Sequence, residues 1–250
     1  MLRRTIFLAA LGLAVVLAVG SAQAEDARSP VLVELFTSQG CSSCPPADEL
    51  IGELARRDDV VALSLHVSYW DYIGWKDAFA IPAATARQKA YDRRLARGRV
   101  YTPQMVIDGV LDEVGSNKAA VRRAIALAQA QSGQKLDIDV ELDQDRNLLV
   151  SIPGAHFDGA ASIWLARYDA VRVTNVARGE NAGRTVRNYN VVRELRRIGT
   201  WTGLPLDIRL PATALTSGDG GRDGCVIIIQ KQGLGPVLAV RRLMLTDGDS

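Results

Sequence analysis

The chain has 250 residues, of which 48% are hydrophobic and 23% are charged, with a formal net charge of +2. This length allows one large domain or two small ones, and three cysteines are too few for a disulfide-dense secreted scaffold. A nearly balanced charge gives no support for nucleic acid as a partner, and we expect none.

Residues 1–24 have the pattern of a secretory signal peptide. Arg3 and Arg4 form a positive n-region, residues 6–20 form an apolar h-region, and Ala22-Gln23-Ala24 is a small-x-small cleavage site. The h-region is too short to span a bilayer comfortably, so we expect no retained membrane span. The sequence therefore predicts a periplasmic or secreted protein, cleaved near Ala24.

The most informative stretch is VLVELFTSQGCSSCPPAD, residues 31–48. Residues 31–36 are almost wholly apolar, which is typical of a strand buried on both faces. After a short turn come Cys41 and Cys44, then two prolines and a helical apolar pattern. The pair therefore lies at a helix N-terminus, where free N–H groups and the helix dipole favour a thiolate. Two cysteines at this spacing can cycle between dithiol and disulfide.

A second strand is predicted at residues 60–68, followed by a cluster of aromatic residues at 69–79 that includes Trp70. Two interpretations of the cluster remain open: a lid or substrate platform beside the cysteines, or a surface loop held by its own aromatic side chains. Residues 81–97 are helical in composition and carry several cations, for which a solvated face is favoured over an anion site. These cations are Arg87, Lys89, Arg93, Arg94 and Arg97.

Residues 100–114 predict a proline-led hairpin. Pro103 stands before a short strand at 104–107, and Asp108-Gly109 between apolar runs is a strong hairpin signal. Ser116 or Asn117 can cap a following helix that ends near residue 131.

The order strand, C-x-x-C helix, strand, helix, proline-led hairpin, helix resembles the thioredoxin fold over residues 30–131. The resemblance implies an α/β thioredoxin-like domain, residues 25–131, with a central mixed sheet and flanking helices. In that family the proline before the third strand is cis and faces the cysteine pair, and Pro103 holds the matching position. Two features differ: Gly40 replaces the aromatic residue that usually precedes the first cysteine, and Ser42 and Ser43 separate the pair.

Longer runs resemble an exported bacterial family of thioredoxin-like proteins of unknown function, domain-of-unknown-function family 1223. The runs are ELFTSQGCSSCPPAD, HVSYWDYIGWKDAFA, YTPQMVIDG, GENAGRTVRNYNVVREL and IGTWTG. This resemblance covers nearly all of the chain after residue 24 and implies a fold, with no settled activity.

The character of the chain changes after the polar linker at residues 132–134. Residues 135–143 alternate between apolar and mostly charged side chains, and further short strand-like runs follow between turn-rich segments. This pattern predicts a smaller all-β, sandwich-like domain at residues 135–245. Its strand-like runs are 148–152, 161–168, 171–176, 206–210, 226–230 and 237–243. Residues 189–198 fit a helix about as well as a strand, and their setting favours a strand.

Three other features bear on function. His66 could join the cysteines in a soft-metal site, but a structural role is favoured, and we assign no metal and no cofactor. Cys225 opens an apolar run, so we expect a buried, unreactive thiol. The polar loop at residues 178–184 is longer than a tight turn needs and could lie over the cysteine site.

The sequence thus predicts an exported thiol-disulfide oxidoreductase that exchanges with a thiol- or disulfide-bearing protein or small molecule. Cys41, at the more exposed N-terminal position, would be the nucleophile, and Cys44 would resolve the mixed disulfide. The substrate groove would be formed by Thr102, Pro103, Ser42, Ser43 and Trp70. The alternative is a non-catalytic binding module in which the pair is a structural disulfide or a soft-metal (copper) site.

Overall fold

The computed structural model describes residues 29–131, 135–216, 218 and 220–245. The expected signal peptide and the expected linker at 132–134 lie outside the described residues. Within the part of the chain that is described, no helix combines the length and the apolarity needed to cross a membrane.

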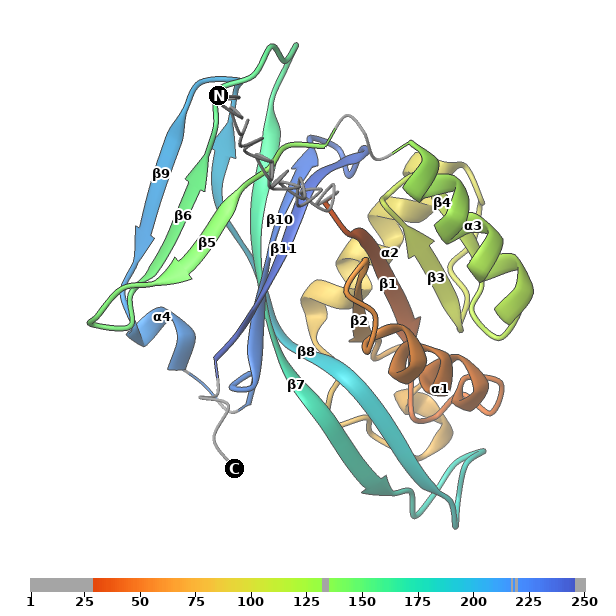
Figure 1. The fold of residues 1–250 in the computed structure, drawn as a ribbon. Helices are drawn as coiled ribbons and strands as arrows, with labels where there is room; N and C mark the ends of the chain where they lie inside the picture. The colour runs from red at the N-terminus through yellow and green to blue at the C-terminus, as the bar shows by residue number, and fades with distance from the viewer. Residues whose placement is uncertain (1–28, 132–134, 217, 219, 246–250) are drawn as a thin grey trace, which may run out of the picture.

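A mixed sheet of eight strands with flanking helices dominates the fold (Figure 1). Its strand order is β11-β10-β7-β8-β2-β1-β3-β4, and a second sheet has the order β5-β6-β9. The large sheet contains β1 (Val31–Thr37), β2 (Val60–His66), β3 (Gln104–Ile107), β4 (Leu111–Val114), β7 (Ala161–Asn175), β8 (Thr185–Trp201), β10 (Gly224–Lys231) and β11 (Val237–Met244). The small sheet contains β5 (Asp139–Leu142), β6 (Leu148–Ile152) and β9 (Leu206–Leu210). The helices are α1 (Pro45–Leu54), α2 (Pro82–Leu95), α3 (Lys118–Ala130) and α4 (Thr213–Thr216), with a 3-10 turn η1 (Asp71–Ile73).

The strands after residue 135 do not form a separate pair of sheets, contrary to expectation. β7, β8, β10 and β11 extend the sheet of β1–β4, and only β5, β6 and β9 pair by themselves. β8 joins β2 in parallel through Ser64 and Val191, and Asn190 Nδ2 donates to the Ala62 carbonyl at 2.8 Å. This pairing covers the otherwise free edge of β2, a site where unpaired backbone groups would be exposed.

Several local predictions are confirmed. Residues 189–198 are strand, within β8, although the two runs expected at 161–168 and 171–176 form one strand, β7. Asp108 and Gly109 both have positive φ, 47° and 72°, as a tight hairpin turn requires. Asn117 caps α3 by accepting from the Ala120 amide at 3.1 Å, and the Thr102–Pro103 bond is cis.

Three apolar cores hold the layers together. Val31, Val33 and Leu35 of β1 pack against α1 and α3, whereas Leu32 and Phe36 on the opposite face pack towards α2. The core on the α2 side also includes residues of β7, β8, β10 and β11, so it extends across both halves of the large sheet. The third core lies between the small sheet and the strands β7 and β10.

The solvated face expected for the helix at 81–97 does not include Arg87, which is only 5% exposed. Arg87 Nε and Nη2 bind Glu34 Oε1 and Oε2 at 2.6 Å and 3.0 Å, and Nη2 donates to Gln230 Oε1 at 2.8 Å. Glu34, the only charge in β1, needs such a partner because an unpaired buried carboxylate is costly. The network therefore ties β1, α2 and β10 together.

Candidate functional site

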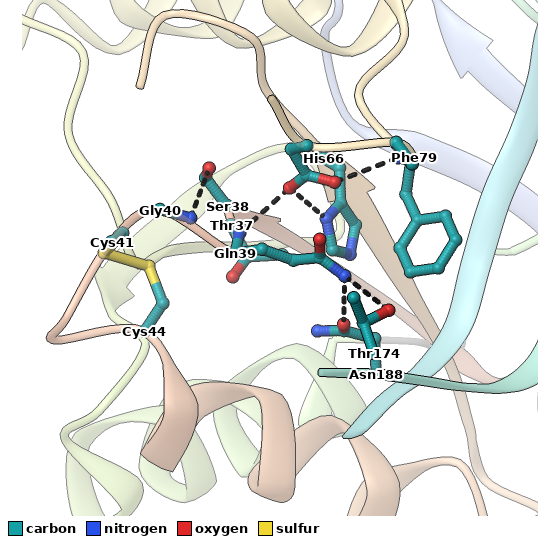
Figure 2. A network of polar contacts seen from close by, with 12 residues as sticks. Thr37, Ser38, Gln39, Gly40, Cys41, Cys44, His66, Phe79, Thr174 and Asn188 are labelled. Atoms are coloured by element: carbon teal, nitrogen blue, oxygen red, sulfur yellow. Dashed lines mark hydrogen bonds and ion pairs between the residues drawn. A yellow bond between two sulfur atoms is a disulfide. The ribbon is translucent and has the colours of Figure 1, made fainter. Parts of the chain in front are cut away.

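Cys41 and Cys44 form a disulfide at the N-terminus of α1, with Cα atoms 5.4 Å apart (Figure 2). Two prolines follow at the start of the helix, where a missing N–H costs nothing. The Cys44 carbonyl accepts from the Ala47 and Asp48 amides at 2.8 Å and 3.1 Å. Cys44 is thus held in the first helical turn, whereas Cys41 belongs to the turn between β1 and α1.

The expectation that Cys41 is the more exposed cysteine is wrong for this structure. Both cysteines are 0% exposed, while Ser42 and Ser43 between them are exposed. The Ser43 hydroxyl lies 3.4 Å from Cys41 Sγ. A segment from much later in the chain contacts this turn and limits the exposure of its two cysteines.

That segment is the loop between β7 and β8, residues 176–184, here called the hairpin loop. Asn181 is 1% exposed, and its Nδ2 donates to the carbonyls of Gln39 and Cys41, both at 2.9 Å. Ser42 N donates to Glu180 Oε2 at 3.1 Å, and hydrogen bonds from Ser42 lower the pKa of Glu180. The loop therefore lies over the cysteine turn, an arrangement that its length allowed but that the sequence did not predict.

The aromatic segment also packs beside this turn. A methyl group on Gly40 would stand 3.1 Å from Ile73 Cδ1 and 3.3 Å from Trp70 Cβ. Glycine at this position therefore lets Ile73 and Trp70 pack closely against the turn. Trp70 Nε1 donates to Thr102 Oγ1 at 2.7 Å. The segment thus lies beside the cysteine turn, while Trp70 also stacks on Tyr72 within the segment. Both interpretations of the segment therefore stay open.

Pro103 is buried near Ala47 in the first turn of α1. Gly115 lies between, because a methyl group there would stand 3.0 Å from Ala47 Cβ and 3.2 Å from Pro103 Cβ. The structure thus joins Trp70 to Thr102 and places Trp70 beside Gly40, while Pro103 is buried. A shared substrate groove with Ser42 and Ser43 stays a prediction.

Sequence reasoning missed a buried polar cluster beside the disulfide (Figure 2). Asp48, His66 and Asp77 are at most 2% exposed. His66 Nδ1 and Gln39 N both bind Asp77 Oδ2 at 2.8 Å, and Thr37 Oγ1 donates to Asp48 Oδ1 at 2.9 Å. Gln39 precedes Cys41 by two residues, so it links the cluster directly to the cysteine turn.

Burial and mutual charge shift the pKa values in this cluster. Burial raises the pKa of Asp48 to about 7, although His66 and Thr37 oppose the shift. Burial disfavours protonated His66, but the carboxylates of Asp77 and Asp48 outweigh this effect and raise its pKa. Burial alone would raise the pKa of Asp77, but the charge and hydrogen bond of His66 lower it. The cluster can therefore take up or release a proton near neutral pH.

The favoured structural role of His66 agrees with its bond to Asp77, although Nε2 has no hydrogen-bond partner among the described residues. The ring packs edge-on against Phe79, with centroids 5.4 Å apart. The residues that the structure describes contain no group of three or more histidine, cysteine, aspartate or glutamate side chains that could hold a metal ion.

Fold and site together define a mixed α/β protein with a C-x-x-C disulfide at the N-terminus of a helix. The family model described as "Protein of unknown function (DUF1223)" matches residues 32–230, and the chain belongs to this family. No curated protein matches the chain.

Two solved structures are similar to this chain. The crystal structure of protein AGR_C_4864 from Agrobacterium tumefaciens is 29% identical, with a TM-score of 0.75 over 88% of this chain and 96% of that one. HBP35 of Porphyromonas gingivalis is 13% identical, with a TM-score of 0.63 over 87% of this chain and 76% of that one. At this identity, the second likeness concerns the fold alone.

Proposed function

We propose that this protein is an exported thiol-disulfide oxidoreductase with a thioredoxin-like arrangement around its cysteine pair. The observation that carries the proposal is the Cys41–Cys44 disulfide, placed where a buried strand runs into the N-terminus of α1. The helix dipole stabilises a thiolate at this position. The signal-peptide pattern of residues 1–24 supports a periplasmic or secreted location.

In the reduced protein, the Cys41 thiolate attacks a disulfide of the partner and releases one partner thiolate. The Cys44 thiolate then attacks Cys41 Sγ, which closes the disulfide and releases the second partner thiolate. Two electrons pass to the partner, and its two thiolates take up two protons. Cys41 is assigned as the nucleophile because it lies outside the helix, in the turn that the hairpin loop covers.

Because both cysteines are buried, exchange requires the hairpin loop to move. This motion breaks the hydrogen bonds between the loop and the cysteine turn, which are two from Asn181 and one to the exposed Glu180. Opening would uncover the cysteines beside Trp70 and Thr102, where a partner can dock. The Asp48–His66–Asp77 cluster supports the chemistry by buffering protons near neutral pH.

Zero exposure of both cysteines favours a second candidate, a binding module with a static disulfide. The two candidates differ in whether the folded protein exchanges with external thiols. We expect glutathione redox buffers to reduce and reoxidise the pair in the native protein. The fraction reduced in buffers of different potential then gives the reduction potential of the pair.

Single variants separate the roles of the cysteines. Cys41→Ser should abolish exchange, and Cys44→Ser should accumulate a mixed disulfide through Cys41. Cys225→Ser is the matched control and should retain the wild-type potential. A pair that dithiothreitol reduces only when the protein unfolds would overturn the enzyme proposal and support the static disulfide.

A further inference from the structure

A large cavity lies away from the cysteine site, between α2 and the strands β7, β8 and β10. Its volume is about 790 Å³, within the range of small-molecule sites. Its lining residues are Ala83, Ala86, Arg87, Ala90, Arg93, Arg94, Ser162, Trp164, Leu195, Lys231, Gly233 and Leu234. None of these residues belongs to the cysteine turn, the hairpin loop or the buried polar cluster.

One wall of the cavity is an alanine face of α2. Ala83, Ala86 and Ala90 recur on successive turns and project towards the cavity. Trp164, Leu195 and Leu234 provide the facing apolar surface. Small side chains on one wall and large ones on the other leave an apolar slot rather than a filled helix–sheet contact.

The polar part of the lining is positively charged. Arg93, Arg94 and Lys231 are exposed at the mouth, and no acidic side chain is found among the described residues that line the cavity. Arg94 Nε donates to the Leu234 carbonyl at 3.1 Å, which fixes its guanidinium beside the slot. Among the described residues, no hydrogen-bond partner is seen for the two terminal nitrogens of Arg94, so they can bind a ligand.

Arg87 forms a rigid wall beside Trp164. Its Cζ lies 5.4 Å from the Trp164 ring centroid, and its buried Nη1 has no hydrogen-bond partner among the described residues. Glu34 balances the charge of Arg87, so the net positive charge of the cavity comes from Arg93, Arg94 and Lys231.

We propose that this cavity binds a small amphiphile with one carboxylate. The apolar body would lie between the alanine face and Trp164, and the carboxylate would bind Arg94 with Arg93 and Lys231 nearby. A concave slot suits a single molecule, whereas recognition of an anionic membrane usually needs clusters of about 4–8 cations. This inference is independent of the redox proposal.

Dodecanoate is a suitable probe. It is titrated into the protein without the expected signal peptide, at dodecanoate concentrations below the critical micelle concentration. Calorimetry should show saturable binding, and the tryptophan fluorescence, to which Trp164 contributes, should change with the same midpoint. Dodecanol, which has the chain without the charge, should bind about tenfold more weakly, since a charged hydrogen bond is lost. Equal affinity for the two probes would overturn the carboxylate assignment.

Matched variants test the location. Arg94→Gln should weaken dodecanoate binding about tenfold, and Ala86→Phe should abolish it by filling the slot. Lys89→Gln is the control, because it removes an exposed cation of the same helix outside the cavity. Equal loss in Lys89→Gln and Arg94→Gln, or unchanged binding in Ala86→Phe, would contradict this site. If the Ala86→Phe variant still binds anionic phospholipid vesicles, the cations would instead be interpreted as a membrane-binding surface, which would contradict a single bound molecule.

Discussion

Asp48 stands in the first turn of α1, a position where an acidic side chain usually faces solvent and interacts with the helix dipole. In this structure it is 2% exposed and shares a buried cluster with His66 and Asp77. The cluster costs desolvation free energy that only its hydrogen bonds and mutual charges offset. In the proposed function, these groups take up and release protons beside the disulfide.

The raised pKa of Asp48 predicts a pH dependence of stability. Between its ordinary value of 3.8 and about 7, the folded state binds a proton that the unfolded state releases. The free energy of unfolding should therefore fall as pH rises through this window. His66, whose pKa is also raised, acts in the same direction above its ordinary value of 6.5. Asp77, whose pKa is lowered, contributes stability that is lost in acid.

Asp48→Asn should remove most of this slope. Urea unfolding from pH 4 to pH 7 should show that its stability relative to wild type improves by roughly 2–4 kcal/mol across the window. Asp58→Asn, at an exposed position in the turn after α1, is the control. Parallel pH profiles for wild type and Asp48→Asn would show that Asp48 does not hold a proton in the folded state.

At the level of elements, the hairpin loop is the segment that contacts the cysteine turn, and in the proposed function it controls access to the disulfide. It follows β7 and returns through β8, so its position is set by the longest strand pair of the sheet. Its tip holds the cysteine turn mainly through polar contacts, and these break more readily in water than an apolar core does.

Asn181→Ala should speed exchange at the disulfide. The variant loses both hydrogen bonds to the Gln39 and Cys41 carbonyls. The loop should therefore open more often, while the overall fold stays the same. We expect the rate of reduction by dithiothreitol to rise severalfold. The rate is measured from the appearance of free thiols, without denaturant and at low ionic strength. Arg178→Ala, an exposed change in the same loop, should leave the rate unchanged. An unaltered rate in Asn181→Ala would exclude the loop as the barrier.

Helix α1 meets β8 at Gly52. A methyl group there would stand 2.6 Å from the Tyr189 ring, so this glycine permits the helix to approach the strand. Alanine in a helix interior usually stabilises relative to glycine by about 1 kcal/mol. Here Gly52→Ala should instead destabilise the protein by about 1–3 kcal/mol through overpacking.

A double-mutant cycle provides the control. In a Tyr189→Ala background, Gly52→Ala should become neutral or stabilising, because the obstructing ring is gone. Thermal or urea unfolding of the four proteins measures the coupling. Additive effects would mean that the Gly52–Tyr189 contact does not limit the packing of α1.

Across the whole molecule, one sheet and one shared core join the two segments that the sequence divides at residues 132–134. The core beneath α2 contains Phe36 and Val61 from the first segment and Tyr168 and Val226 from the second. The Glu34–Arg87–Gln230 network crosses the same junction. We therefore expect both segments to unfold in one cooperative transition.

Cys225 reports on this transition. Its thiol is 0% exposed in the core between the two sheets, and burial raises its pKa to about 12. A thiol reagent should label Cys225 slowly in the native protein. As the urea concentration rises, the increase in labelling should coincide with the loss of the far-UV circular dichroism signal. The Cys41→Ser/Cys44→Ser background removes competing thiols. Fast native labelling, or labelling well before the loss of circular dichroism, would contradict a single cooperative unit.

The sequence by itself determined the features that depend on neighbouring residues. A continuous apolar run marked β1 and apolar periodicity marked α1. The C-x-x-C spacing indicated the disulfide, Asp108-Gly109 indicated the hairpin, and the quoted runs indicated the family. These are local signals, because backbone preferences and short-range spacing decide them.

Only the tertiary structure decided how distant segments meet. Alternation marked the later strands but not their partner, because any strand edge offers the same backbone groups, and so β8 was not expected to pair with β2. The cysteine turn is buried by Asn181, which lies 140 residues further along the chain than Cys41. Asp48, His66 and Asp77 likewise come from three separate segments. Burial and charge pairing depend on which distant groups close over a residue, and no local pattern encodes that.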